Sequence, residues 1–144
     1  MAEIDYSQFS ILIVDDVPLN LLLVDKMLSR FKFKIRKASS GQKALDAVAE
    51  SKPDLVLLDL MMPGIDGFEV LARLRANENT KNLHVVILSA LNSDNDIVKG
   101  FKAGANDFIT KPILMDRLIK CVENQIEQIV EERGGIVVGT KEYN

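Results

Sequence analysis

The chain has 144 residues, enough for one domain with a single core and too few for two ordinary domains. Its formal net charge of −3 argues against direct binding to nucleic acid, because such binding needs a basic surface that neutralises phosphates. No apolar run approaches the roughly 20 residues of a membrane span, and the single cysteine, Cys121, cannot form an internal disulfide, so we expect a cytoplasmic protein without membrane contact.

The first predicted strand is the apolar, β-branched run "ILIVDD", residues 11–16, which stops at two acids. Residues 18–31 follow as a predicted helix, since Pro18 suits a first helical turn and apolar residues then recur at helical spacing. The next run, "FKIRKA", alternates apolar and basic side chains, as a strand near a sheet edge would. Residues 41–50 have the spacing of a second helix. The faces expected to be buried contain Val24, Met27, Leu28 and Phe31 in the first helix, and Ala44, Leu45 and Val48 in the second.

The run "PDLVLLDL", residues 53–60, is a second wholly apolar strand, and it carries an acid, Asp59, near its far end. An ionised carboxylate at the mouth of an apolar strand is costly to desolvate unless a cation, a partner or chemistry holds it there. The Pro- and Gly-rich turn "MMPGIDG" then leads into a helix over 68–76. We expect this helix to bury Phe68, Leu71 and either Leu74 or Ala72.

The rest of the chain continues the alternation. "HVVILSA" is a third buried strand, residues 95–104 form a short helix, "DFIT" is a strand, and residues 113–132 form a long closing helix that contains Cys121 as a small apolar residue. Strands that are apolar throughout are buried on both sides, which predicts a parallel sheet with helices on both faces. The fold class expected is therefore α/β: a doubly wound, flavodoxin-like, five-stranded parallel sheet, for which we infer the strand order 2-1-3-4-5 from its class.

Three carboxylates should meet at one edge of this sheet. In the expected order the first and third strands are neighbours, and they end at Asp15 and Asp16 and at Asp59 respectively. Left alone, these carboxylates would repel one another and raise one another's pKa values. A hard divalent cation removes the conflict, and carboxylate and carbonyl oxygens suit Mg²⁺ better than a softer metal.

A hydroxyl and an amine should reach the same edge. The fourth strand ends at Ser89, and the fifth is followed by Lys111 and Pro112. Taken singly, an Asp after a strand is often a helix cap, such a Ser a turn residue and such a Lys a surface charge. Together with a metal they are what phosphoryl transfer requires, with a carboxylate available as nucleophile.

With these residues at the strand ends, the chain resembles the receiver domain of two-component response regulators, from about residue 11 to about residue 128. The resemblance rests on "VDD", "LLDLMMPGIDG", "LSA" and "GANDFITKP", each at the end of a predicted strand. It implies that Asp59 accepts a phosphoryl group from a histidine kinase or a histidine phosphotransfer protein. It also implies that Asp16, Asp59 and the backbone carbonyl of Met61 bind Mg²⁺, with Asp15 acting largely through water. Ser89 and Lys111 would contact the phosphoryl oxygens. The peptide between Lys111 and Pro112 would be cis.

The resemblance also implies a switch. Ser89 would move toward the phosphoryl group and Phe108 would turn inward behind it, shifting the face formed by the fourth helix, fifth strand and fifth helix. An ordinary core phenylalanine is the alternative for Phe108. Partner binding, or homodimerisation through this face or the extended last helix, would follow. In relatives, polar side chains two residues after the acceptor and two after the serine help to position the hydrolytic water, so the apolar Met61 and Leu91 predict slow self-dephosphorylation.

The domain organisation expected is an N-terminal extension over residues 1–9, a receiver over 10–132, and a tail or linker start over 133–144. The last helix offers a wide apolar stripe, which suits either the core or a dimer seam. The short remainder after Glu132 leaves open a stand-alone regulator and a piece of a hybrid kinase or multidomain regulator. The stripe contains Leu118, Ile119, Val122, Ile126, Ile129 and Val130.

The sequence is a poor match to two other functions. An aspartate-nucleophile hydrolase of the haloacid dehalogenase type needs two aspartates spaced by one residue after its first strand, whereas Asp15 and Asp16 are adjacent. A phosphorylation-independent docking module is disfavoured by the complete set of acids, Ser89 and Lys111. We therefore expect a signalling domain, rather than an enzyme, that takes part only in its own phosphorylation and dephosphorylation. The lone His84 is expected to be a surface or strand-edge residue rather than a phosphodonor.

Overall fold

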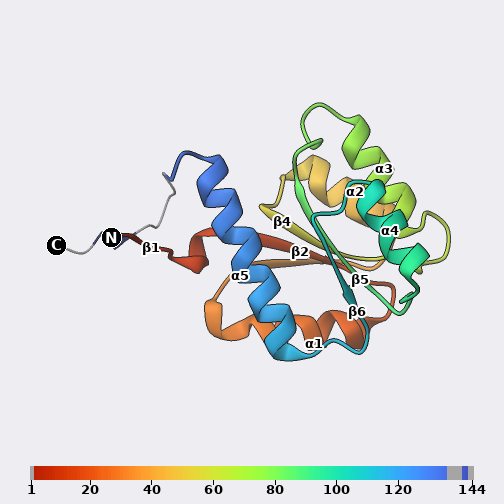
Figure 1. Ribbon diagram of the computed structural model, residues 1–144, viewed down its shortest axis with the longest axis horizontal. Coiled ribbons are helices and arrows are strands. Elements are labelled where there is room, and N and C mark those ends of the chain that lie inside the picture. The colour runs from red at the N-terminus through yellow and green to blue at the C-terminus, as the bar shows by residue number, and fades with distance from the viewer. Residues whose placement is uncertain (1, 136–140, 143–144) are drawn as a thin grey trace.

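The protein is described here from a computed structural model, covering residues 2–135 and 141–142. Its main sheet has five parallel strands in the order β3-β2-β4-β5-β6, which confirms the predicted flavodoxin-like order (Figure 1). The central strands β2, β4 and β5 are almost entirely buried, whereas the edge strand β3 is partly exposed. The bounds are β2 Ser10–Val14, β3 Lys34–Ala38, β4 Leu55–Asp59, β5 His84–Ser89 and β6 Asp107–Thr110.

Five α-helices cover the two faces of the sheet. One face packs against α1 (Pro18–Leu28) and α5 (Met115–Glu132), and the other against α2 (Gly41–Glu50), α3 (Gly67–Ala76) and α4 (Asp94–Lys102) (Figure 1). Each face has its own apolar cluster, so the sheet is buried on both sides, as parallel sheets usually are. No helix in the described part of the chain is long and apolar enough to cross a membrane.

Local sequence explains where the helices begin. Pro18 occupies the start of α1, where its missing N–H costs no hydrogen bond. The Ser40 and Asp66 side chains accept a backbone N–H at the starts of α2 and α3. Ser93 and Asp96 form a reciprocal capping box at the start of α4. These caps fix the helix starts near the carboxyl ends of the strands.

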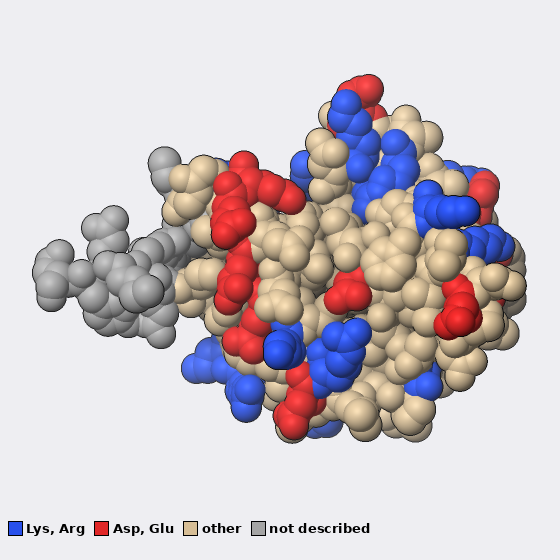
Figure 2. All heavy atoms as spheres, in the orientation of Figure 1, with Lys and Arg blue, Asp and Glu red and all other residues tan. Residues whose placement is uncertain are grey.

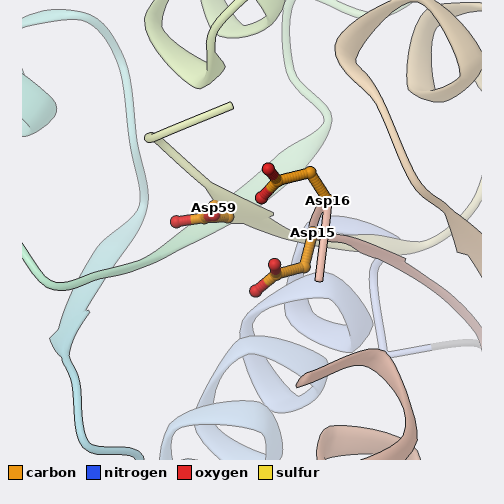
Figure 3. A group of neighbouring side chains, drawn as sticks. All are labelled: Asp15, Asp16 and Asp59. Atoms are coloured by element: carbon orange, nitrogen blue, oxygen red, sulfur yellow. The ribbon is translucent and has the colours of Figure 1, made fainter. Parts of the chain in front are cut away.

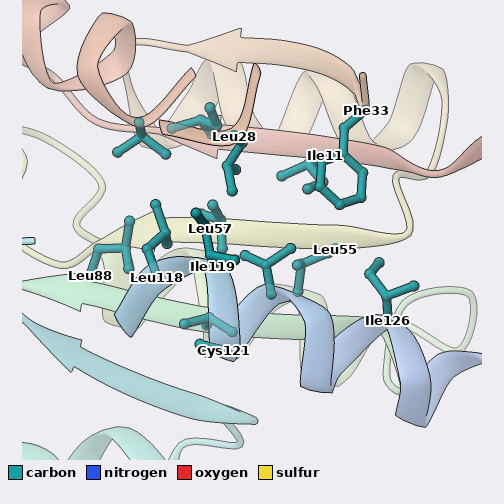
Figure 4. Close-up of a cluster of buried hydrophobic side chains, with 14 of the residues drawn as sticks. Ile11, Leu28, Phe33, Leu55, Leu57, Leu88, Leu118, Ile119, Cys121 and Ile126 are labelled. Atoms are coloured by element: carbon teal, nitrogen blue, oxygen red, sulfur yellow. The ribbon is translucent and has the colours of Figure 1, made fainter. Parts of the chain in front are cut away.

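The apolar stripe of α5 is used by the core. Figure 4 shows Leu118, Ile119 and Ile126 packed between this helix and the sheet. All six stripe residues belong to this cluster, five of them buried and Val130 partly buried, so of the two expected uses of the stripe the structure shows the core. The seam was conceivable from sequence because the helix lies over the sheet and also against α1, and therefore needs a wide apolar face.

Other details differ from the sequence predictions. In α3, Leu74 is buried and Ala72 is exposed, and Phe68 is only partly buried. The chain also forms elements that the sequence patterns did not reveal. These are the 3-10 turn η1 (Tyr6–Gln8) and a short antiparallel pair between β1 (Ala2–Glu3) and β7 (Lys141–Glu142). The helix predicted over residues 18–31 ends at Leu28, and its last three residues form a second 3-10 turn, η2 (Ser29–Phe31).

Candidate functional site

The three predicted carboxylates lie together at the carboxyl edge of the sheet. Asp15 and Asp16 directly follow β2, and Asp59 is the last residue of the neighbouring strand β4 (Figure 3). One oxygen from each carboxylate lies within 4.8 Å of the others. Asp15 and Asp59 are buried, and Asp16 is partly exposed. The strand order thus brings together residues separated by more than 40 positions in the sequence.

Asp15 is held by donors from two sides. Its Oδ1 accepts the backbone N–H of Val17 at 2.9 Å, and its Oδ2 accepts the Asn20 amide at 3.1 Å. The Lys111 ammonium lies 3.0 Å from the same Oδ2. Sequence reasoning missed Asn20. A helix beginning at Pro18 places its side chain back toward the end of β2, and that spacing could have indicated the contact.

Asp59 lies in an environment that disfavours its charged form. Burial raises the pKa of its carboxyl, and the Lys111 ammonium, 3.6 Å away, opposes that rise. The neighbouring Asp15 and Asp16 carboxylates raise the pKa further, while the backbone N–H of Met61, which donates to Asp59 at 3.4 Å, favours the ionised form. The net pKa of Asp59 is above that of an ordinary aspartate. A positive charge placed among the three acids would relieve this conflict.

Ser89 and Lys111 reach the same edge from β5 and β6. Ser89 is fully buried, and its Oγ accepts the Leu91 N–H at 3.1 Å. The backbone N–H of Lys111 donates to the Ser89 carbonyl at 2.7 Å, which ties the two strand ends together. The peptide between Lys111 and Pro112 is cis, as expected. The chain therefore brings a hydroxyl and an ammonium to the edge that holds the acids.

The donor set fits a divalent cation. Three clustered carboxylates and the Lys111 ammonium beside them leave an excess of negative charge when all are ionised. Hard oxygen ligands suit Mg²⁺, which also keeps several waters and so needs few protein ligands. Asp16 is the member of the cluster with a partly exposed side chain, so the group is open to solvent on one side.

Close packing holds the loop and helix beside Asp59. A side chain at Gly67 would overlap the Asp59 carbonyl oxygen, and the Gly67 N–H donates to the Leu60 carbonyl at 3.0 Å. Glycine is therefore required where α3 begins against the end of β4. Met61 projects from this loop with 57% of its surface exposed, which leaves it at the rim of the site.

Phe108 is buried in this structure, 6% exposed, against α4. A Cβ atom at Gly100 would lie 2.9 Å from Cδ2 of its ring, so the absence of a side chain at Gly100 makes room for the phenyl group. The inward-facing position is occupied here.

His84 is the first residue of β5, away from the carboxyl edge, which confirms the expected position at a strand end, but it is not a surface residue because it is only 3% exposed. Its Nδ1 lies 2.7 Å from the Gln125 side-chain oxygen, and its Nε2 lies 2.9 Å from the Glu132 carboxylate. Both partners come from α5, whose last turns cover the histidine. The residue therefore links α5 to the sheet.

Known proteins with similar sequences and folds are consistent with this arrangement. Residues 11–123 match the family model of the response regulator receiver domain. The response regulator PleD of Caulobacter vibrioides is 41% identical over 103 residues, which cover 72% of this chain and 23% of PleD. Protein PilH of Pseudomonas aeruginosa is 34% identical over 112 residues, covering 78% of this chain and 93% of PilH. The solved receiver domain of the Francisella response regulator 1452 superposes with a TM-score of 0.78 at 31% identity, covering 83% of this chain and 98% of that one.

The chain spans only part of several curated relatives. It matches between 23% and 50% of the length of the first five. The remaining parts of those proteins have no counterpart in the match.

Proposed function

The chain belongs to the response regulator receiver domain family of two-component signalling, and on this premise we propose that Asp59 is its phosphoacceptor. One observation carries the proposal: Asp59 is buried beside two further carboxylates and an ammonium, with a pKa above that of an ordinary aspartate. Such a carboxylate is under electrostatic strain that a cation or a covalent bond would relieve. Packing of the apolar core does not require a carboxylate at this position.

In the proposed reaction an Asp59 carboxylate oxygen attacks the phosphorus of a phosphohistidine. An O–P bond forms and the N–P bond breaks, and the imidazole nitrogen leaves with the electron pair. The Lys111 ammonium, 3.6 Å from Asp59, is placed to stabilise negative charge on the transferred group. The Ser89 hydroxyl would donate to a phosphoryl oxygen, because it comes from the adjacent strand end.

Asp16, Asp59 and the Met61 backbone carbonyl would hold Mg²⁺, with Asp15 acting largely through water. When bound, the ion supplies positive charge that offsets the three acids and the phosphoryl oxygens. Asp15 is otherwise occupied, since Val17, Asn20 and Lys111 all contact its carboxylate. Its principal task would be to position Lys111.

The surface around the site supports a protein as phosphodonor. A donor that carries phosphohistidine must contact the rim of the carboxyl edge, and this rim is apolar where α1, the Met61 loop and the start of α5 meet solvent. Apolar surface of this kind is typical of protein interaction sites. The rim residues are Val17, Leu19, Leu22, Leu23, Met61, Leu114 and Met115. A histidine kinase or a histidine phosphotransfer protein is the donor proposed.

The output would be a shift in the face formed by α4, β6 and α5. Ser89 and Phe108 are the residues proposed to connect the site to this face. The Ser89 carbonyl is bonded to the backbone of Lys111 at the end of β6, and Phe108 lies in β6 under Gly100 of α4. Phosphorylation would bias these contacts between two packings. We expect the phosphorylated form to decay slowly, because Met61 and Leu91 cannot hydrogen-bond the attacking water.

The test is the intact mass of the protein after incubation with acetyl phosphate and Mg²⁺. One phosphoryl group is expected on the natural chain, and none on Asp59→Asn or without the metal. Asp66→Asn is a matched control, because Asp66 is an exposed cap of α3 in the following loop and Asn can also cap a helix. Labelling of the control should equal that of the natural chain.

Small-molecule donors can fail for reasons of access, so a second measurement uses beryllofluoride with Mg²⁺. Binding should raise the melting temperature of the natural chain and leave that of Asp59→Asn unchanged. Failure of both measurements would overturn the proposal and leave a receiver fold used as a phosphorylation-independent docking module.

A further inference from the structure

One stretch of this acidic protein is rich in basic residues and contains no acid. Seven of the 18 basic residues lie between Lys26 and Lys43, and no acidic residue occurs in that stretch. Arg30, Lys32 and Lys34, which we name the basic corner, follow the end of α1 and lead into β3, and all three are exposed. In the described part of the chain, neither Lys32 nor Lys34 makes a side-chain hydrogen bond or an ion pair.

A row of acids lies on the exposed side of α5. Glu123, Glu127 and Glu131, which we name the acidic row, recur every four residues and so occupy one side of the helix. Like charges at this spacing repel and destabilise an isolated helix. Within residues 2–135, no lysine or arginine forms an ion pair with any of the three. An external positive surface would relieve this repulsion.

The basic corner and the acidic row lie on the same side of the molecule, joined by aromatic side chains. The centre of the Tyr6 ring lies 5.4 Å from that of Phe31 and 5.5 Å from that of Phe33. The Arg30 guanidinium lies 4.9 Å from the Phe31 ring centre. On its other side Tyr6 faces α5, since Glu123 and Glu127 contribute to raising the pKa of its hydroxyl. Figure 2 shows acidic side chains in a row over α5 and basic side chains at the adjacent corner.

This surface is self-complementary. A two-fold axis through its aromatic centre would place the basic corner of one copy on the acidic row of the other, and the same contact would occur a second time. Arginine and tyrosine at the centre, with charged residues around them, also match the composition of protein interfaces. We propose that two copies of this chain associate through the surface formed by the basic corner, Tyr6 and the acidic row.

Protection of the sheet edge against pairing with other chains would explain only part of the basic corner. Lysines on an edge strand discourage pairing with other strands, and this accounts for Lys34 in β3. It does not account for Arg30 and Lys32, which precede the strand, or for the unpaired acids of α5. The proposed dimer does not depend on phosphorylation of Asp59, so it can stand or fall separately from the proposed function.

The test is sedimentation velocity of the full chain over a range of concentration and salt. The natural chain should form dimers at low salt and dissociate as salt screens the contact. Lys32→Glu with Lys34→Glu, and separately Glu127→Lys with Glu131→Lys, should each weaken dimerisation at least about tenfold. Glu50→Lys with Glu78→Lys is the matched control, because both residues are exposed and lie away from the proposed surface, at the end of α2 and in the turn after α3. Its dimerisation should be unchanged.

A mixture of the two reversed variants provides the sharpest result. The variant Lys32→Glu with Lys34→Glu carries net negative charge at both the basic corner and the acidic row. The variant Glu127→Lys with Glu131→Lys carries net positive charge at both. Neither should dimerise alone, whereas an equimolar mixture should form the heterodimer. A natural chain that stays monomeric at low salt would overturn the proposal, as would equal weakening in the control or no association in the mixture. Binding of DNA or of anionic lipid vesicles by a monomeric chain would assign the basic corner to another partner and overturn it too.

Discussion

At the scale of single residues, Asp59 shows most directly how stability and function oppose each other. Its carboxyl is buried next to Asp15 and Asp16, and the attraction of Lys111 does not fully offset these costs, so its pKa is raised. An acid whose pKa is higher in the folded than in the unfolded chain destabilises the fold once it is ionised. This penalty is present at neutral pH, and it disappears as pH falls through the raised pKa of the folded form toward the ordinary value of about 4.

Asp59→Asn should therefore stabilise the metal-free protein at neutral pH. The expected gain is about 1 kcal/mol, or about 3 °C in melting temperature for a domain of this size. The gain should shrink as pH is lowered, because the natural Asp59 then becomes protonated and loses its penalty. Calorimetric melting of both proteins between neutral pH and about pH 4 measures the difference in their free energies of unfolding. The titration of all other groups is common to both proteins and largely cancels in this difference.

Asp66→Asn provides the control for this prediction, since Asp66 is exposed and both residue types cap helices well. Its melting temperature should follow that of the natural chain at every pH. A gain for Asp59→Asn that does not vary with pH would contradict the electrostatic explanation and indicate a packing effect.

Some site residues were accessible to sequence reasoning and others were not, for a physical reason. Asp15, Asp16, Asp59, Ser89 and Lys111 each lie at the end of a recognisable strand or just after it, so the strand order alone brings them to one edge. The contact of Asn20 depends on where the following helix begins, and His84, which lies away from the site, has no local signal. The burial of His84 depends on Gln125 and Glu132, which are 41 and 48 residues away, and no local pattern predicts which helix covers the start of a strand.

At the scale of elements, Arg75 connects α3 to the turn after α4. Its guanidinium is half-buried, which lowers its pKa, and it donates to the Gly104 carbonyl at 2.7 and 3.0 Å and to the Thr80 carbonyl at 3.3 Å. These bonds satisfy carbonyls that lie outside the helices. Because α4 belongs to the face proposed to move, Arg75 fixes one end of that face.

Arg75→Ala should destabilise the protein by about 2 kcal/mol, because it removes charge-assisted hydrogen bonds and leaves partly buried carbonyls without donors. Arg73→Ala is the matched control on the same helix, where an exposed pair with Glu69 should be worth less than about 0.5 kcal/mol. Urea unfolding followed by circular dichroism gives both values. Equal losses in the two variants would show that the Gly104 contact contributes little.

The elements themselves were predicted to different degrees. The strands β2, β4 and β5 are apolar throughout, and the alternating pattern of β3 marked it correctly as an edge strand. The turn η1 was missed because a three-residue element has no periodicity, and η2 was predicted as the last turn of an α-helix because its residues continue the apolar spacing of α1. The pair β1 and β7 joins the two ends of the chain, so its pattern is not local either.

At the scale of the whole molecule, the end of α5 is held to the edge of the sheet opposite the acidic site. His84 contacts Glu132, and Arg133 lies 2.6 Å from Asp54, whose other oxygen accepts the Ser10 backbone N–H at 2.8 Å. The N-terminal segment adds Phe9, which is buried, and Tyr6, which packs on Phe31 and Phe33. We propose that the folding unit extends beyond the expected receiver boundaries of 10 and 132 at both ends.

Trimming the chain tests these boundaries. A chain of residues 4–135 should keep the stability of the full protein, because it retains the Phe9, Tyr6 and Arg133 contacts, and among the described elements it loses the short pair of β1 and β7. A chain of residues 10–132 should be less stable by about 4 kcal/mol, since losing one buried phenylalanine alone typically costs about 3 kcal/mol or more. Phe9→Ala in the full chain is the control and should account for most of this loss. Equal urea midpoints for the two trimmed chains would instead place the boundaries where the sequence alone suggested, because the terminal contacts would then contribute no net free energy.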